Sequence, residues 1–155
     1  MADTFSFRQA ETLKKVLKKL RVDYLFIGKS GAILLGYSDT TQDADLFVKK
    51  DPANTKQLLN ALKQIGFKLD RAMVKEILRG KDFIQLRNGP FDVDLVFAPD
   101  GIESFEKAWS RHLEVQGFPI CHLDDIIRSK EKANRVKDRE SLPRLRAFRD
   151  YWKKR

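Results

Sequence analysis

The feature that most constrains this chain is a pair of short apolar segments that each carry acids at alternate positions. The first segment is residues 43–48 (DADLFV), and the second is residues 91–97 (FDVDLVF). Apolar runs of this length, rich in Val and Phe, predict strands that lie inside a sheet. Residues two apart in a strand share a face, so the carboxylates of Asp43 and Asp45 converge. Two like charges beside a core are costly unless a cation joins them.

The rest of the chain alternates between helical and strand patterns. Leu13 and Leu17 follow helical spacing, Pro52 suits the first turn of a helix, and Asn88-Gly89 predicts a turn between two strands. We expect helices at 7–20, 30–35, 52–65, 104–109, 123–134 and 139–152, with Pro143 in about the first turn of the last helix. We expect strands at 23–27, 43–48, 67–73, 82–87, 91–97 and 112–117. This order predicts an α/β (α+β) fold, in which helices flank one mixed β-sheet and C-terminal helices close the structure.

Length and composition are those of a small globular protein. The 155 residues predict a single domain over 1–155, and we expect the 11 Phe residues, Trp109 and Trp152 to belong to its core rather than to base-stacking surfaces. No apolar run approaches the roughly 20 residues that cross a bilayer, and the first residues lack the pattern of a signal peptide. The lone Cys121 cannot form a disulfide within the chain, and its apolar surroundings predict burial. We therefore expect a cytoplasmic protein without membrane contact.

The net charge of +9 is concentrated near the C-terminus. Residues 126–155 contain 12 Lys and Arg against 4 Asp and Glu, whereas the remainder is almost balanced. A basic segment of this kind attracts phosphates, whether on a nucleotide, a nucleic acid or an acidic partner. The alternative is a pair of solvated helices that are rich in lysine.

Three carboxylates on neighbouring strands predict a metal site. Asp43 and Asp45 would come from one strand, and Asp94 lies deeper in its apolar run than Asp92 does. Hard oxygen ligands favour Mg²⁺ or Mn²⁺, and three carboxylates suit the two-metal chemistry of phosphoryl transfer. Asp92 shares a face with Asp94, so it is an alternative third ligand, although we prefer to interpret it as a solvated strand start. Solvent-facing carboxylates without a metal are the other interpretation.

A glycine turn precedes the first acids. The apolar run 23–27 stops at Gly28-Lys29-Ser30, and a helical pattern follows. Such a turn lets backbone N–H groups approach a phosphate. It is not a P-loop, because the Walker pattern requires a Gly five residues before Gly28, where this chain has Asp23. An ordinary strand-to-helix turn remains the alternative.

Together these residues resemble the DNA polymerase beta-like nucleotidyltransferase superfamily, in its small bacterial single-domain type. The family pattern is an apolar strand, a Gly-Gly or Gly-Ser turn, about ten residues, an Asp-x-Asp pair and a third acid on a later strand. The runs 36–46 (GYSDTTQDADL) and 123–130 (LDDIIRSK) are also similar to those members, so the likeness covers roughly residues 20–150. Two positions depart from it: Lys29 stands where the second Gly or Ser is usual, and Asp39 stands where an Arg is common.

The resemblance implies a Mg²⁺-dependent (or Mn²⁺-dependent) nucleotidyltransferase that binds an NTP such as ATP. It would move a nucleoside monophosphate to an unknown hydroxyl acceptor, which could be a protein, an RNA end or a small molecule. Its implied metal ligands are Asp43, Asp45 and Asp94. Gly28, Lys29 and Ser30 would hold the triphosphate.

The same resemblance places Lys130 where it would reach the triphosphate, although a solvated helix face is the alternative for this residue. The second function that we consider is an inactive module of this fold. It would bind nucleic acid or a partner protein through the basic C-terminal helices, for example in a toxin–antitoxin or phage-defence system. Metal-dependent use of an NTP would separate the two functions.

Overall fold

A computed structural model describes residues 4–154 and contains one mixed six-stranded sheet. The strands are β1 (Tyr24–Ile27), β2 (Ala44–Val48), β3 (Phe83–Leu86), β4 (Val93–Val96), β5 (Leu113–Val115) and β6 (Phe118–Ile120). Their order across the sheet is β3-β4-β2-β1-β6-β5. The pairs β2–β4 and β1–β6 are parallel, and the other three pairs are antiparallel. The predicted fold class is therefore confirmed.

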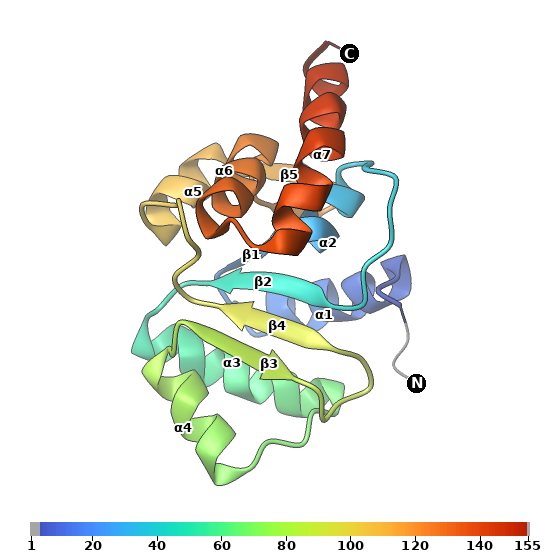
Figure 1. The fold of residues 1–155 in the computed structure, drawn as a ribbon. Coiled ribbons are helices and arrows are strands. Elements are labelled where there is room, and N and C mark those ends of the chain that lie inside the picture. The colour runs from blue at the N-terminus through green and yellow to red at the C-terminus, as the bar shows by residue number, and fades with distance from the viewer. Residues whose placement is uncertain (1–3, 155) are drawn as a thin grey trace.

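Helices cover both sides of the strands. They are α1 (Phe7–Lys19), α2 (Gly28–Leu34), α3 (Pro52–Ile65), α4 (Arg71–Arg79), α5 (Phe105–Arg111), α6 (Leu123–Ala133) and α7 (Val136–Lys154). In Figure 1, α3 and α4 lie below β2, β4 and β3, whereas α6 and α7 lie above them. Helix α2 packs between the sheet and α6, so the turn that begins it lies under the C-terminal helices.

Strand register brings distant acids together. β2 and β4 are parallel neighbours, and Asp45 is the direct partner of Asp94 across the pair. β1 runs antiparallel to β2 on its other side, with Ile27 opposite Asp45. The end of β1, and therefore the turn into α2, thus lies beside Asp45, on the side away from Asp94.

Local signals account for most helix boundaries. Asp51 accepts a hydrogen bond from the backbone N–H of Asn54 at the start of α3, Pro52 occupies its first turn, and Gly66 ends it with a left-handed backbone. Asp70 caps α4 in the same way, by accepting from Met73 N–H. A cap of this type stabilises a helix by about 1 kcal/mol.

Three expectations about elements were wrong. The strand expected at 67–73 is absent, because Asp70 caps the amphipathic helix α4 there. The strand β6 was missed; both Gln116 and Gly117 have positive φ, which allows the two-residue turn between β5 and β6. Pro143 lies inside α7, because that helix begins at Val136 rather than at 139, so one backbone hydrogen bond inside α7 is missing.

The core is largely the predicted one. Phe26, Phe47 and Phe118 are almost fully buried at its centre, and Cys121 is buried and free, as expected. Three aromatic side chains expected in the core are instead exposed, namely Phe7 at 54%, Phe83 at 44% and Trp109 at 42%. Phe7 packs edge-on against Phe118. Within residues 4–154, no helix is long and apolar enough to cross a membrane.

Candidate active site

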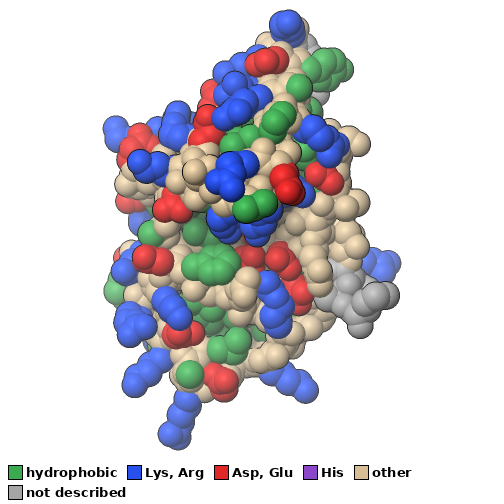
Figure 2. Space-filling model, in the orientation of Figure 1, with side chains coloured by type: hydrophobic (Ala, Val, Ile, Leu, Met, Phe, Trp, Pro, Cys, Tyr) green, Lys and Arg blue, Asp and Glu red, His purple; other side chains and the backbone are tan. Residues whose placement is uncertain are grey.

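The predicted carboxylates meet at one cavity of about 670 Å³. Asp43, Asp45 and Asp94 line it from the strands, and Lys29 and Lys130 line it from α2 and α6. Figure 2 shows acidic and basic side chains gathered at the middle of the face where the strands meet the C-terminal helices. Three acids and two lysines therefore line the same cavity. They come from β2 and the residue before it, from β4, and from α2 and α6.

Asp45 and Asp94 are two carboxyl groups of this cavity whose pKa values are raised. Burial, and then the charge of Asp94, raise the pKa of Asp45 to about 8, although Lys130 opposes the shift. Burial, and then the charge of Asp43, raise the pKa of Asp94, whereas Arg87 lowers it. The two residues are direct partners across the parallel strand pair, so the charge of each disfavours ionisation of the other. The pair therefore retains a proton where two isolated aspartates would both be ionised.

Arg87 lies among the acids, on the link between β3 and β4. Its Nη1 is 3.0 Å from Asp94 Oδ1, its Nη2 is 3.4 Å from Asp43 Oδ2, and its Nε is 3.8 Å from Asp92 Oδ2. One guanidinium thus lies within ion-pair distance of the carboxylates of Asp43, Asp92 and Asp94. It supplies part of the positive charge that the acids require.

Asp92 is not the solvated strand start that we expected. It is as buried as Asp94, at 7% exposure each, and it accepts a hydrogen bond from Gln42 Nε2. Asp94 lines the cavity with Asp45, whereas Asp92 turns toward Gln42 and Arg87. This placement favours Asp94 as the third acid of the cavity.

Gly28 and Ser30 position Asp45. Gly28 has a φ of 65°, and a Cβ atom there would lie 2.5 Å from Asp45 Oδ2, so only glycine lets the turn approach this carboxylate. Ser30 is fully buried; its hydroxyl donates to the Ile27 carbonyl and accepts from the Asp45 backbone N–H at 2.9 Å. Both hydrogen bonds of the hydroxyl are directed inward, and they join the end of β1 to β2.

The two departures from the family pattern contact each other. Lys29 Nζ lies 3.3 Å from Asp39 Oδ2, and Arg144 of α7 lies 3.6 Å from the same oxygen. Arg144 also donates to the Ser38 carbonyl at 2.8 Å. A hydrogen bond from the Thr40 backbone, together with Lys29, holds the pKa of Asp39 below its usual value. Asp39 thus links the first turn of α2 to the C-terminal helix.

Lys130 points from α6 into the cavity. Its side chain is 13% exposed, and its Nζ lies 3.5 Å from Oδ1 of Asp138, which is fully buried. Burial lowers the pKa of Lys130, while the charges of Asp138 and Asp45 oppose that shift. Arg135 also binds Asp138, with its Nε 2.8 Å from Oδ2. The lysine is therefore positioned from both sides, by the start of α7 and by the acids of the sheet.

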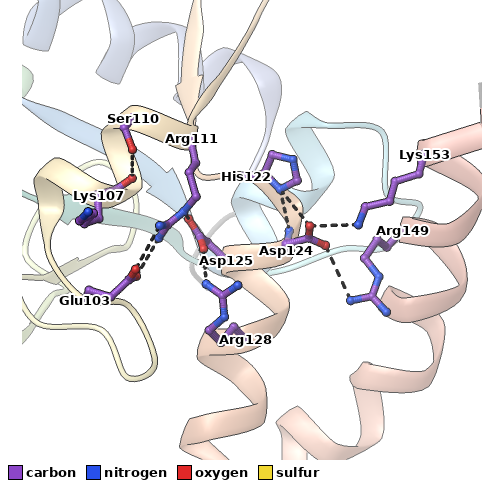
Figure 3. Close-up of polar contacts among 10 residues, drawn as sticks. All are labelled: Glu103, Lys107, Ser110, Arg111, His122, Asp124, Asp125, Arg128, Arg149 and Lys153. Atoms are coloured by element: carbon purple, nitrogen blue, oxygen red, sulfur yellow. Dashed lines mark hydrogen bonds and ion pairs between the residues drawn. The ribbon is translucent and has the colours of Figure 1, made fainter.

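A second cluster of ion pairs fixes α6 in place (Figure 3). Asp125 is fully buried and binds Arg111 Nε at 2.9 Å and Arg128 Nη1 at 2.6 Å. Arg111 also forms a two-pronged pair with Glu103. These contacts attach α6 to α5 and to the segment before it, so the cluster supports the helix that carries Lys130.

A further part of the cavity lining was not predicted. Asp82, Phe83 and Gln85 contribute to it from β3 and the residue before it, and Asp100 contributes from a loop whose next residue, Gly101, packs against α6. Phe83 and Gln85 alternate with the buried Ile84 and Leu86 along β3. That alternation was visible in the sequence and would have placed Phe83 on the open face. Arg87 had no comparable signal, because its partners lie on other segments.

The chemistry of the acids fits a hard divalent cation. Asp43, Asp45 and Asp94 offer only carboxylate oxygens, and Asp94 Oδ1 is buried and accepts no hydrogen bond from residues 4–154. As they lie in this structure, no three or more His, Cys, Asp or Glu side chains among the described residues are arranged to hold a metal ion. Arg87 lies within ion-pair distance of Asp43 and Asp94, so it takes up part of their charge.

Comparison with known proteins gives a structural likeness. The sequence matches no protein-family profile and no curated protein. The structure is similar to a crystal structure of the lincosamide antibiotic adenylyltransferase LnuA with lincomycin bound, with a TM-score of 0.63 at 12% sequence identity. The likeness covers 93% of this chain and 98% of that chain. At this sequence identity the structural likeness establishes the fold and nothing further. The chain has the nucleotidyltransferase fold.

Proposed function

We propose that this protein is a Mg²⁺-dependent nucleotidyltransferase that moves a nucleoside monophosphate from an NTP to a hydroxyl acceptor. The observation that carries the proposal is the meeting of Asp43, Asp45 and Asp94 at one cavity that two lysines also line. The fold adds support, because the similar solved structure is that of an adenylyltransferase. Fold alone does not establish an activity, so the residues of the cavity bear the argument.

The acids have distinct roles in this proposal. Asp43 and Asp45 would hold divalent cations, which stabilise the negative charge of the phosphates during transfer. Asp94 would share one of these cations, orient the acceptor hydroxyl and help to take its proton. The acceptor oxygen then bonds to the α-phosphorus, and pyrophosphate leaves. Gly28 and Ser30 contribute by keeping Asp45 against the turn at the end of β1.

The two lysines are proposed to bind the triphosphate. Lys130 is held by Asp138 and faces Asp45, so it presents a positive charge close to the carboxylates. Lys29 contacts Asp39, and we propose that it exchanges this partner for phosphate oxygens.

We further propose that the acceptor is a small molecule. The cavity of about 670 Å³ has the size of sites for small ligands. Phe83 offers an exposed aromatic face in the cavity lining, and Asp82 and Asp100 offer acceptors for hydroxyl or amino groups. The similar solved protein holds lincomycin, an antibiotic, which supports an acceptor of this size.

The test is transfer from each of four α-³²P-labelled NTPs, with Mg²⁺ and a panel of hydroxyl-bearing small molecules. We expect a labelled product, and pyrophosphate release that Asp45→Asn abolishes. An Asp100→Asn variant serves as a control, because Asp100 is an exposed residue of the cavity lining outside the proposed metal ligands and we expect it to alter acceptor affinity rather than NTP binding. Labelling of RNA or of a protein instead would support the nucleotidyltransferase activity and contradict the proposal of a small-molecule acceptor.

A second candidate function is the inactive binding module. Arg87 against the acids and Asp39 against Lys29 favour it, because both contacts neutralise groups that catalysis would use. Fluorescence anisotropy with labelled RNA tests this candidate. RNA binding that Lys132→Ala and Lys137→Ala weaken, without any NTP binding, would support the module and contradict the enzyme.

A further inference from the structure

We infer that Arg87 is an internal counter-ion that exchanges with the divalent cation: its guanidinium holds Asp43 and Asp94 together, and cation binding displaces it. The inference rests on the proposed cation site. It adds a positioning residue that neither the acid pattern nor the lysines indicate.

The geometry of the three contacts supports this exchange. Two nitrogens of one guanidinium reach Asp94 at 3.0 Å and Asp43 at 3.4 Å, and the third approaches Asp92 at 3.8 Å. Asp43 and Asp94 are two of the three acids proposed to share the cation. The guanidinium therefore lies against the oxygens that a cation would use.

A cation and this guanidinium cannot both keep those positions. Mg²⁺ binds oxygens at about 2.0–2.1 Å and requires a nearly ideal arrangement of ligands. A fixed positive charge a few ångströms away would repel it in a partly buried site. The 3.0 Å between Arg87 Nη1 and Asp94 Oδ1 shows that the two charged groups are in direct contact.

Arg87 also has the freedom to leave. Its side chain is 38% exposed, and it lies after the last residue of β3, on the link to β4. The arginines around Asp125 are similarly exposed, at 33% and 50%, but they bind a fully buried carboxylate at 2.6–2.9 Å, as expected of a structural pair. The looser distances at Arg87 suit a contact that is made and broken.

The exchange has a consequence for binding order. A cation that arrives alone must replace two ion pairs, whereas a cation that arrives with a nucleotide brings phosphate oxygens as further ligands. Arg87 thus lowers the affinity for the free cation and keeps the acids together until the nucleotide complex binds.

The first test follows Arg87 in the wild-type protein. The side-chain ¹⁵Nε signals of the arginines are recorded by NMR during a Mg²⁺ titration. We expect the Arg87 signal, identified by its absence from Arg87→Lys, to shift toward the position of a solvated arginine. The Arg128 signal, whose partner is Asp125, should stay in place.

The second test is calorimetry with Mn²⁺ alone on wild type, Arg87→Gln, Arg87→Lys and Arg71→Gln. Arg87→Gln should bind Mn²⁺ about fivefold or more tightly, which is the effect of losing about two partly exposed ion pairs. Arg87→Lys should lie near wild type. Arg71 is on α4 and forms no ion pair with residues 4–154, so Arg71→Gln makes the same change of net charge without the contact.

Three results would overturn the inference. Unchanged Mn²⁺ affinity in Arg87→Gln with a fixed Arg87 signal means that Arg87 is a static structural residue. Equal tightening in Arg71→Gln means that net charge is the cause. If wild type, Arg87→Gln and Arg71→Gln all bind no Mn²⁺, the proposed cation site itself is wrong, which separates that failure from the failure of Arg87 alone.

Discussion

At the scale of single residues, the cavity is defined by acids that are held closer than their charges favour. Asp45 and Asp94 face each other across two strands, and both have raised pKa values because burial and a neighbouring acid disfavour ionisation. Gly28 allows the turn to press against Asp45, and Ser30 fixes the backbone beside it. These residues are separate in the sequence, and the site exists because the fold brings them close together.

Neutralising Asp45 should stabilise the metal-free protein. The pKa of Asp45 is raised to about 8, so the folded state binds a proton that the unfolded state releases between about pH 4 and pH 8. Wild-type stability therefore falls as pH rises through this window. Asp45→Asn should be more stable by at least about 1 kcal/mol at pH 7–8, and the difference should vanish near pH 4.

Urea denaturation at several pH values measures this effect, with Asp100→Asn as the control at an exposed carboxylate. A variant that is less stable than wild type at every pH would show that Asp45 is a structural hydrogen-bonding residue. In that case, repulsion among the carboxylates would no longer be a reason to expect a bound cation.

Substituting Gly28 should disrupt the contact between the turn and the acid. In Gly28→Ala the new Cβ adds a left-handed strain of about 1–2 kcal/mol and also a clash with Asp45 Oδ2 at 2.5 Å. Gly117→Ala is the matched control, because Gly117 also has a positive φ, of 82°, but its nearest neighbour is the flexible end of Lys14. Thermal unfolding should show a clearly larger loss for Gly28→Ala. Equal losses would mean that Asp45 moves aside without cost.

At the scale of elements, α7 is attached to the rest of the molecule by charge. Arg144 binds Asp39, Arg149 and Lys153 bind Asp124, and Arg146 binds Glu131. Figure 3 shows Arg149 and Lys153 of α7 directed at Asp124 of α6. The excess of basic residues in the last part of the chain is therefore partly used inside the molecule, and α7 lies over α2 and α6 as a consequence.

Lys130 should serve the nucleotide and not the stability of α6. In Lys130→Ala, Asp138 keeps Arg135 as its partner, so we expect a loss of stability below about 1 kcal/mol. Affinity for a non-hydrolysable NTP analogue should fall at least about fivefold, because a charge-assisted contact to phosphate is lost. Lys132→Ala, an exposed lysine on the same helix, should leave that affinity unchanged. Calorimetry on both variants shows whether Lys130 binds the nucleotide or belongs to a solvated helix face.

At the scale of the whole molecule, the cavity lies between two groups of elements. The acids come from β2 and β4, whereas Lys29 and Lys130 come from the helices that lie above the strands in Figure 1. A ligand that contacts both groups should stabilise the protein as a unit. That coupling gives a test that needs no knowledge of the acceptor.

An NTP and Mg²⁺ together should raise the melting temperature more than either does alone. At one hundred times the dissociation constant, the gain is about 2.7 kcal/mol, which corresponds to several degrees in a protein of this size. Asp94→Asn should erase this gain while raising the melting temperature of the metal-free protein. An intact gain in Asp94→Asn, with a greater loss in Asp92→Asn, would assign the third ligand to Asp92.

Periodicity and local chemistry were enough to predict much of this protein. The strands that carry Asp43, Asp45 and Asp94 followed from short apolar runs, and the bounds of α3 followed from Pro52 and Gly66. Such signals depend on residues that are close in the chain, so they can be interpreted without the fold. The spacing of the acids also predicted that they would meet, since adjacent strands of a sheet bring equivalent positions together.

Tertiary structure alone decided the rest. Arg87 reaches Asp43 and Asp94 from another segment, and Asp39 pairs with Lys29 and with Arg144, which is more than a hundred positions away. Asp92 likewise accepts a hydrogen bond from Gln42, which is 50 positions away in the chain. These contacts depend on strand order and on the path of α7, which no local pattern encodes. The sequence by itself therefore determined which acids the protein has and where its strands lie, whereas the three-dimensional packing determined which positive charges compensate those acids.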